Sequence, residues 1–328
     1  MATLDQGTRP ALSSVPPTSV QPGGYGLAVR LELAVARLRR ALQRRFRPDY
    51  VRGMNIKRQG NCPGCPHDVI DSRDLKYVRN VCGYHFGPDD DPYRRPGLFA
   101  LARPGLADVA FGTVVLLGLA ALLLVLSRLH PVLGLAAAAC AAVWVFVVSF
   151  FRDPPRAIPA DAAALVSPAD GTVTGVGEVE EADFPGGRAF RVSIFLSPLN
   201  VHVNRAPRSG RVVGLRYFPG KFLPATRPDC DRVNEQFWLD LEEPSGRRLR
   251  VKQVSGAVAR RIVCWLRPGE EVRAGERYGM IKLGSRTDVL LPVGEAIEVL
   301  VKVGDRVAGG QTVLLRFRDE AAEAAGTG

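Results

Sequence analysis

Residues 278–292 read Tyr-Gly-Met-Ile-Lys-Leu-Gly-Ser-Arg-Thr-Asp-Val-Leu-Leu-Pro, and this stretch decides how the rest of the chain is interpreted. Two apolar runs, Met280 to Leu283 and Val289 to Leu291, predict β-strands on either side of a polar break at Gly284-Ser285. Taken alone, the stretch predicts a hairpin, because glycine adopts unusual dihedral angles and serine and aspartate favour turns. Motifs elsewhere in the chain point to a chemical role for the same break.

Five shorter motifs accompany this stretch, and each is weak by itself. In chain order they are Phe151-Arg152-Asp153-Pro154, Ser167-Pro168-Ala169-Asp170-Gly171, the run Ser-Pro-Leu-Asn-Val-His-Val-Asn-Arg-Ala-Pro over 197–207, Tyr217-Phe218-Pro219-Gly220-Lys221-Phe222, and Asn234-Glu235. Together with Gly284-Ser285, the ordered set resembles the phosphatidylserine decarboxylase family, and most of all its shorter, archaeal-type branch. The resemblance covers about residues 150–318, over half of the chain.

The resemblance implies a proenzyme that cuts itself between Gly284 and Ser285. The Ser285 hydroxyl would attack the Gly284 carbonyl carbon, where glycine has no Cβ to obstruct it. Cleavage would leave two associated chains, 1–284 and 285–328, and would convert Ser285 into a pyruvoyl group. That ketone is the cofactor with which the family, as a carboxy-lyase, converts phosphatidylserine to phosphatidylethanolamine. Archaetidylserine is a further substrate that the core motifs leave open, because its reacting headgroup is identical.

The other site residues are also assigned through the resemblance. His202 is the expected base, with a strand histidine in a structural hydrogen bond as the alternative. Asp170 either orients a histidine or forms the Asp-Gly turn that its motif suggests. Longer family members have a second histidine where this chain has Arg205. We therefore expect Arg205 to bind the substrate carboxylate or phosphate, and Lys221 to contact phosphate or the lipid surface.

Charge and composition indicate the kind of partner. The chain has 328 residues, a formal net charge of +11, 46% hydrophobic residues and 7% aromatic residues. A basic protein suits nucleic acid or anionic lipid. We expect anionic lipid and no nucleic acid, because the sequence has no aromatic-basic RNA-binding pattern and its apolar residues crowd between 107 and 151.

Two apolar runs, Ala107 to Ser127 and Val132 to Phe151, lie on either side of a break at residues 128–131. Each is long enough to cross roughly 30 Å of hydrocarbon at about 1.5 Å per residue. They predict a transmembrane helical hairpin over 104–152, with a re-entrant or interfacial hairpin as the alternative. Arginines on both flanks predict that both ends, and the catalytic domain that follows, lie on the cytoplasmic face of the cell membrane.

The N-terminal residues form two further predicted parts. Residues 1–26 are rich in Pro, Ser, Thr and Gly and are predicted to be disordered. Residues 27–50 have apolar residues at steps of three and four among many arginines, which indicates a basic amphipathic helix. Such a helix suits an anionic membrane surface or packing against the protein itself, and the pattern leaves both open.

Residues 51–103 hold a predicted zinc-binding segment and a linker. Two pairs of ligands, each spaced by two residues, can close a tetrahedral Zn²⁺ site. The predicted ligands are Cys62, Cys65, Cys82 and His85, and His67 is a competing ligand. Reduced thiols in a loop-rich segment are the alternative, since the six cysteines do not form a disulfide framework.

Residues 153–318 are predicted to form a mostly antiparallel β catalytic domain, preceded by the helical hairpin and the small Cys/His-rich segment. Its expected strands include Gly171–Val176, Ala189–Leu196, Gly210–Tyr217, Phe237–Leu241, Arg248–Val254 and Ile262–Leu266. A turn pattern at 269–275 recurs at 304–310 and resembles the barrel-sandwich hairpins of biotinyl and lipoyl carriers. The tail, 319–328, is predicted to be frayed. A membrane-tethered, zinc-containing scaffold with an inactive domain is the alternative of a different class.

Overall fold

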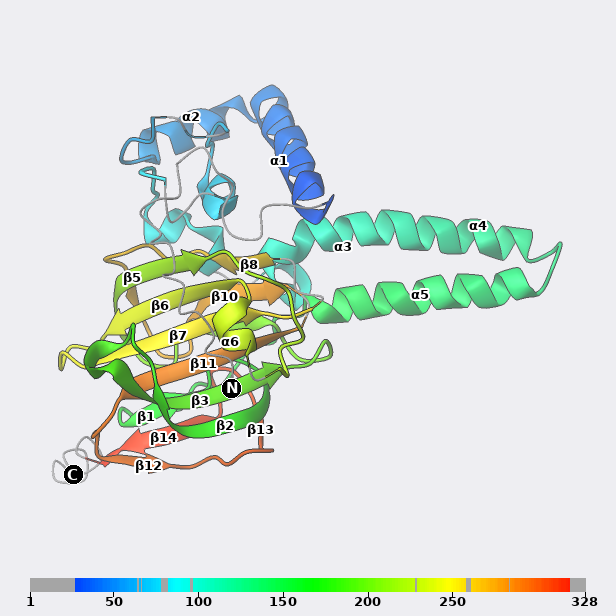
Figure 1. Cartoon of the computed structure of the whole chain (residues 1–328). Helices are drawn as coiled ribbons and strands as arrows, with labels where there is room; N and C mark the ends of the chain where they lie inside the picture. Colours follow the sequence, from blue (N-terminus) through cyan, green and yellow to red (C-terminus); the bar gives the residue numbers. More distant parts are fainter. Residues whose placement is uncertain are drawn as a thin grey trace.

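The computed structural model describes residues 27–63, 65, 67–77, 82–94, 97–227, 229–257, 261–282 and 284–318. The predicted disordered segment, 1–26, and the predicted frayed tail, 319–328, lie outside the described residues. Figure 1 shows a β-rich body, a pair of long helices that project from it, and a smaller helical part beside their base. The predicted fold class is confirmed, because antiparallel sheets dominate and follow two apolar helices and a Cys-rich segment.

One large antiparallel sheet organises the body, with its eight strands in the order β13-β2-β3-β11-β7-β6-β5-β9. These strands are β2 (Gly171–Glu180), β3 (Arg188–Leu196), β5 (Gly210–Phe218), β6 (Gln236–Glu242), β7 (Arg248–Ser255), β9 (Glu271–Val272), β11 (Ser285–Pro292) and β13 (Arg306–Val307). Alternate residues of a strand point to opposite faces of the sheet. One face buries the main apolar core, to which Ile194, Val251 and Val289 belong.

Two three-stranded sheets complete the body, in the orders β1-β14-β12 and β4-β10-β8. Their strands are β1 (Ala164–Val166), β4 (Val203–Arg205), β8 (Arg261–Cys264), β10 (Arg277–Lys282), β12 (Ile297–Val299) and β14 (Val313–Phe317). The six strands named from the sequence therefore all form, with shifted ends.

The predicted hairpin across Gly284-Ser285 is wrong. β10, before the break, pairs with β4 and β8, whereas β11, after it, pairs with β3 and β7. The two strands belong to different sheets, and the chain crosses from one sheet to the other at Gly284. Local composition predicted both strands but not their partners, since pairing depends on residues that are distant in the chain.

The repeated turn pattern forms two matching units at opposite edges of the large sheet. β9 lies at one edge and β13 at the other, and each is a two-residue strand. Gly275 and Gly310, which follow these strands, have φ of +74° and +77°. A Cβ added at Gly310 would lie 3.5 Å from Gly275 Cα. The two edges therefore approach each other, and the sheet curls into a half-barrel.

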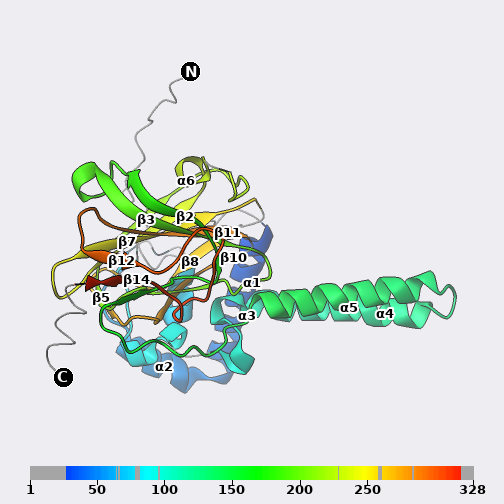
Figure 2. The same cartoon turned by 90° about the horizontal axis from the view of Figure 1, so that it is seen from below.

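Two apolar helical segments form the projection seen in Figures 1 and 2. The first covers Arg103–Leu126 and contains α3 (Leu106–Gly112), the π-helical stretch η7 (Thr113–Leu117) and α4 (Gly118–Leu126); the second is α5 (Val132–Phe150). Both are long and apolar enough to cross a membrane, and their most apolar windows are 0% and 6% buried in the protein. Trp144 Nε1 donates to Thr113 Oγ1 at 2.9 Å, so polar groups of the two helices pair with each other.

The helical part beside the hairpin base contains α1 (Leu27–Phe46) and α2 (Pro48–Lys57). Short 3-10 helices follow α2, namely η2 (Ser72–Tyr77), η3 (Pro88–Asp90), η4 (Pro92–Arg94), η5 (Leu98–Ala100) and η6 (Arg103–Gly105). Two more short helices, η8 (Pro185–Gly187) and α6 (Cys230–Val233), lie in the β body. α1 packs with its polar side inward, where Glu32 and Arg40 are 2% and 7% exposed. Its apolar stripe points outward, with Leu38 and Phe46 61% and 72% exposed. The helix thus packs against the protein and still presents an apolar surface.

Candidate active site

Gly284 and Ser285 form the junction between β10 and β11. Gly284 has φ of +66°, a conformation that favours glycine, and no described atom lies within 4 Å of a Cβ added there. Ser285 is fully buried at the start of β11, opposite Leu196 of β3 and Ser255 of β7. Its Oγ has no hydrogen-bond partner among the described residues. Because an unpaired buried hydroxyl is costly, such a group in a native fold calls for a functional explanation.

His202 supplies the ring that faces this junction. Its Nδ1 donates to the Asn200 carbonyl at 2.9 Å, so the lone pair is on Nε2, which accepts from Gly284 N–H at 3.4 Å. The ring is fully buried, and its centroid lies 4.2 Å from that of Phe150. Burial lowers the pKa of His202 to about 4; the Asn200 carbonyl opposes this effect and Arg152 adds to it. The imidazole is therefore neutral and able to accept a proton.

The junction lies at the base of the helical hairpin. Phe150 is the last residue of α5 and packs in a buried cluster with Val203, Trp265 and Met280. Val203 belongs to β4, which begins directly after His202, and Met280 belongs to β10, which ends two residues before Gly284. The site is thus held beside the surface from which the hairpin projects.

Gly256 leaves room for the Gly284 carbonyl. A Cβ added at Gly256 would clash with that carbonyl oxygen and would lie 3.5 Å from Ala225 Cβ. Ala225 belongs to the loop between β5 and α6. This loop therefore covers Gly256 next to the junction.

Comparison with known proteins connects this geometry to one family. The sequence model of phosphatidylserine decarboxylase matches residues 144–315. A phosphatidylserine decarboxylase proenzyme from Rhodopirellula baltica is 41% identical over 246 residues, which cover 74% of this chain and 99% of the relative. Proteins of the same name from Symbiobacterium thermophilum and Trichlorobacter lovleyi are 47% and 42% identical over 224 and 223 residues. Each alignment covers 68% of this chain, and 97% and 99% of the respective relative.

The chain belongs to the phosphatidylserine decarboxylase family. The predicted membership is confirmed, and with it the predicted enzyme class, carboxy-lyase. The matched region contains the junction, His202 and the covering loop, so the family resemblance extends to the site itself.

In this phosphatidylserine decarboxylase family member, Asp170 does not lie against His202. Its carboxylate accepts from Arg156 Nη2 at 2.8 and 2.9 Å and from Gly309 N–H at 2.7 Å. Both nitrogens of His202 are meanwhile engaged with Asn200 and Gly284. The expectation that Asp170 orients this histidine is therefore corrected. Its other predicted role, a turn residue directly before β2, agrees with its position.

Arg205 is buried in the seam between the two repeated turn units. Its guanidinium donates to the Gly275 carbonyl at 3.0 Å and to Asp153 at 2.9 Å, and Arg277 pairs with the same carboxylate. Burial and the positive charge of Arg277 lower the pKa of Arg205 to about 10, while Asp153 opposes them. With 4% of its surface exposed, Arg205 closes the half-barrel, and the structure does not bring it to the junction as a substrate contact.

Lys221 lies in the loop that covers the junction. Its backbone pairs with Val233 and Glu235, and its side chain is exposed. Ser255 Oγ donates to the Lys221 carbonyl at 3.5 Å, and Ser255 is the register partner of Ser285. The position is compatible with a phosphate or lipid contact, which stays a prediction.

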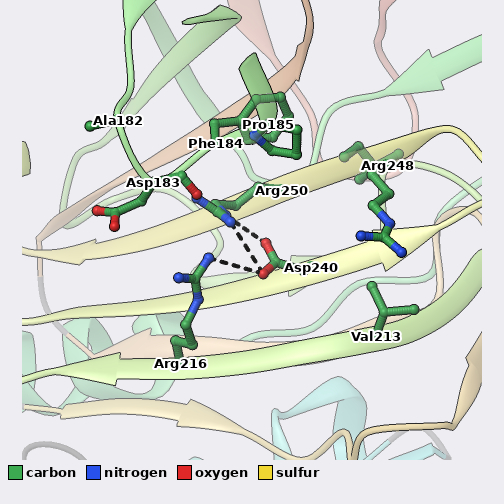
Figure 3. A pocket seen from close by; sticks show the side chains of 10 residues that line it. Ala182, Asp183, Phe184, Pro185, Val213, Arg216, Asp240, Arg248 and Arg250 are labelled. Atoms are coloured by element: carbon green, nitrogen blue, oxygen red, sulfur yellow. Dashed lines mark hydrogen bonds and ion pairs between the residues drawn. The ribbon is translucent and has the colours of Figure 1, made fainter. Parts of the chain in front are cut away.

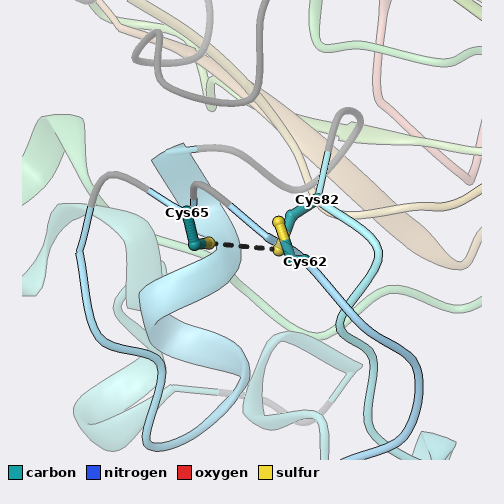
Figure 4. A group of neighbouring side chains, drawn as sticks. All are labelled: Cys62, Cys65 and Cys82. Atoms are coloured by element: carbon teal, nitrogen blue, oxygen red, sulfur yellow. Dashed lines mark hydrogen bonds between the residues drawn. The ribbon is translucent and has the colours of Figure 1, made fainter.

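Three of the four predicted zinc ligands come together. The Sγ atoms of Cys62, Cys65 and Cys82 all lie within 4.8 Å of one another, and Figure 4 shows the three side chains converging. His85 is not part of this group, because its backbone pairs with Gln59 and its Nδ1 lies 3.4 Å from the Gly83 carbonyl. The competing ligand is also engaged elsewhere, since His67 Nε2 lies 2.6 Å from the Asp74 carbonyl. The structure thus supports a three-cysteine cluster and not the predicted Cys3His set.

A surface cavity of about 430 Å³ lies apart from the junction (Figure 3). Asp240 lies on its floor and accepts from Arg250 Nε at 2.5 Å and from Arg216 Nη2 at 3.3 Å. Arg250 is the register partner of Leu290, one residue from core-facing Val289. Because side chains alternate, the cavity opens on the sheet face opposite the one that carries Ser285.

The structure adds site residues that the motifs did not indicate. Gln253 Nε2 donates to Asn204 Oδ1 at 2.8 Å, and Asn204 Nδ2 donates to Thr287 Oγ1 at 3.2 Å. These buried groups link β7, β4 and β11 on the face that carries Ser285. Asn204 lies inside a matched motif and was within reach of sequence reasoning. Gly256 was not, because a glycine after a strand carries no signal of a close approach.

Proposed function

We propose that the chain is a phosphatidylserine decarboxylase proenzyme that cuts itself between Gly284 and Ser285. The observation that carries this proposal is the buried Ser285 Oγ, which has no hydrogen-bond partner among the described residues, in a serine that follows a glycine of positive φ. Family membership supports the reaction, because the relatives are named as proenzymes of this decarboxylase.

Breaking the peptide bond uses only groups of this chain, and water enters at the last step. Ser285 Oγ attacks the Gly284 carbonyl carbon, the C–N bond breaks, and the serine nitrogen takes up a proton, which leaves an ester. Loss of the Ser285 Cα proton then breaks the Cβ–Oγ bond and releases Gly284 as a carboxylate at the end of chain 1–284. Water converts the remaining dehydroalanine to ammonia and a pyruvoyl group on chain 285–328.

His202 is the base in this proposal. Its neutral Nε2 already faces Gly284 N–H and takes the Ser285 hydroxyl proton when that long hydrogen bond opens. The Asn200 carbonyl fixes the tautomer, and the Phe150 ring, tilted by 37° at a centroid distance of 4.2 Å, packs against the imidazole. Once formed, the pyruvoyl ketone supplies the electron-withdrawing carbonyl for loss of CO₂ from a serine headgroup. His202 remains beside it to hold or move a proton.

Gly256 makes the attack geometrically possible. Gly256→Ala is expected to slow self-cleavage at least about 100-fold, because the new Cβ would push the Gly284 carbonyl away from its position. Pulse-labelled chain resolved on a denaturing gel gives the rate. Gly175→Ala is the matched control, since its Cβ would meet Ser193 Oγ at an ordinary 3.5 Å. Cutting of Gly256→Ala at the control rate would contradict this role.

The pKa of His202 sets the acid limit of self-cleavage. Because protonated imidazole cannot accept a proton, the rate is expected to stay level from pH 8 to about 5.5 and to reach half its value near pH 4. A histidine of ordinary pKa would lose half its rate at about pH 6.5. Circular dichroism at each pH shows that the chain is still folded. A midpoint near 6.5 would exclude a buried, neutral His202 as the base.

The membrane arrangement supports access to a phospholipid. The two apolar helices would span the bilayer, and arginines on both flanks would keep the catalytic body on the cytoplasmic face. α1 runs beside the hairpin base in Figure 1, so its exposed apolar stripe would enter the headgroup region. Protease added to inverted membrane vesicles should digest residues 153–318. Digestion only in right-side-out vesicles would reverse the topology.

The stripe of α1 has its own test. In Phe46→Trp, brominated anionic lipids should quench the added tryptophan fluorescence relative to the parent chain, because Phe46 is 72% exposed at the end of the stripe. Unchanged fluorescence of the added tryptophan would show that the stripe stays in water.

The Cys62, Cys65 and Cys82 thiolates are proposed ligands of a structural Zn²⁺. In a tetrahedral site with Zn–S bonds of about 2.3 Å, the sulfur atoms lie a little under 4 Å apart. The Sγ atoms of Cys65 and Cys82 lie 3.4 Å apart, which is close to that spacing. The ion would brace a segment whose Cys82 and Tyr84 carbonyls accept from Arg267 of the β body. One equivalent of zinc per purified chain is expected, and Cys82→Ser should lose it. Equal zinc content in both proteins would overturn the assignment.

Two other readings are less well supported. Archaetidylserine is not favoured, because the relatives are named for phosphatidylserine. An inactive scaffold does not account for a buried serine whose hydroxyl has no partner within the described part of the chain.

Intact mass and activity of the purified wild-type chain test the proposal. We expect two chains that correspond to 1–284 and 285–328, with the shorter one blocked to Edman sequencing and reactive to hydrazines. The same preparation should release CO₂ from phosphatidylserine vesicles. A single uncut chain that carries an ordinary serine at 285 would falsify the proposed function.

A further inference from the structure

Lys282 forms a buried ion cluster three residues before the cleavage point. Its Nζ donates to Asp108 Oδ2 at 2.7 Å and to Glu32 Oε1. The Lys282 side chain is 7% exposed and that of Glu32 1% exposed. The three residues come from β10, α3 and α1, so the cluster joins three distant parts of the chain.

A second buried cation, Arg261, also lies beside Glu32. Arg261 of β8 is the register partner of Lys282, is 1% exposed, and its Nε lies 3.7 Å from Glu32 Oε2. Two like charges directly opposite on neighbouring strands repel each other, and burial strengthens the repulsion. The Glu32 carboxylate lies between the two cations and offsets this repulsion.

The cluster is linked to the junction through a short stretch of chain. β10 ends at Lys282, two residues before Gly284. The backbone of Gly284 is held in a positive-φ conformation, and its N–H donates to His202. Cleavage depends on the position of the Gly284 carbonyl carbon to within a fraction of an ångström. A displaced Lys282 would therefore shift the carbonyl that Ser285 must attack.

We infer that Glu32 and Asp108 are positioning residues for self-cleavage. They hold Lys282, and through it the end of β10, so that the Gly284 carbonyl faces Ser285 Oγ. This inference rests on the proposed function and extends the residues needed for self-cleavage beyond 144–315, the region that the family model matches, because both carboxylates lie N-terminal to it. The N-terminal helix and the start of the hairpin thus take part in maturation of the enzyme.

The test compares rates of self-cleavage in full-length chains made in a cell-free system with anionic phospholipid vesicles. The variants are Glu32→Gln, Lys282→Met and the double variant, each followed by pulse-labelling and denaturing gels. Glu243→Gln is the matched control, since Glu243 is 5% exposed and pairs with Arg208 at 2.7 Å directly after the end of β6. Urea unfolding of each chain in a Ser285→Ala background reports stability separately from the rate.

Glu32→Gln and Lys282→Met are each expected to cut about tenfold more slowly than wild type, and the double variant no more slowly than the slower single variant. Glu243→Gln should lose comparable stability but keep the wild-type rate. Wild-type rates in both single variants, or multiplied losses in the double variant, overturn the inference. If Glu32→Gln does not fold, Asp108→Asn decides in the same way, with an expected loss of about threefold. An uncut wild-type chain would instead overturn the proposed function, and this inference with it.

Discussion

Ser285→Ala is expected to remain a single uncut chain with no decarboxylase activity. The alanine cannot attack Gly284, so neither the ester nor the pyruvoyl group can form, and the loss is complete rather than partial. The substitution removes a buried hydroxyl that has no partner among the residues the structure describes, so the fold should be as stable as the parent or more stable. Denaturing gels, intact mass and CO₂ release from phosphatidylserine vesicles measure the three outcomes.

Ser255→Ala is the matched control for this experiment. Ser255 is also fully buried and lies directly opposite Ser285 in the pairing of β7 with β11. It is expected to cut normally. Two bands from Ser285→Ala, or one band from Ser255→Ala, would mean that the nucleophile has been assigned to the wrong strand.

His202→Gln should slow self-cleavage by about 100- to 10,000-fold, the range typical of a lost general base. The variant loses the Nε2 lone pair that faces Gly284, and it also loses the ring contact with Phe150. Chain that does cut after long incubation should still decarboxylate slowly, because the same ring lies beside the mature site. Activity is therefore divided by the amount of hydrazine-reactive short chain.

His67→Gln serves as the control for the histidine experiment. His67 is a partly buried histidine bound to the Asp74 carbonyl in the N-terminal part, and its loss should leave both rates unchanged. Full decarboxylase activity per cleaved chain in His202→Gln would restrict His202 to maturation. If His202→Gln also cut itself at the normal rate, His202 would have no role in the mechanism.

Much of the fold was predictable because it depends on local pattern. Short Val- and Ile-rich runs between glycines predicted strands such as β3 and β7, and uninterrupted apolar runs predicted the helical hairpin. The repeated glycine turns likewise predicted two matching units, which became the edges β9 and β13. In each case the signal lies within a few residues.

The candidate site was predictable only at positions where the proposed reaction requires one particular type of residue. Gly284, Ser285 and His202 were found from motifs, and the structure brings them together. Asp170 and Arg205 were assigned by analogy with longer family members, and both are engaged in ion pairs away from the junction. Motif position alone could not show this, because a charged side chain takes the partner that folding brings nearest.

The sequence by itself determined the elements of this protein, its two apolar helices and the glycyl-seryl pair at which self-cleavage is proposed. Only the tertiary structure decided that β10 and β11 belong to different sheets, that Gly256 makes space for the Gly284 carbonyl, and that Glu32 holds Lys282. The physical reason is the distance along the chain over which each interaction acts. Strand and helix propensities act between neighbouring residues, whereas strand register, buried charge pairing and close backbone approach depend on contacts between segments far apart in the chain.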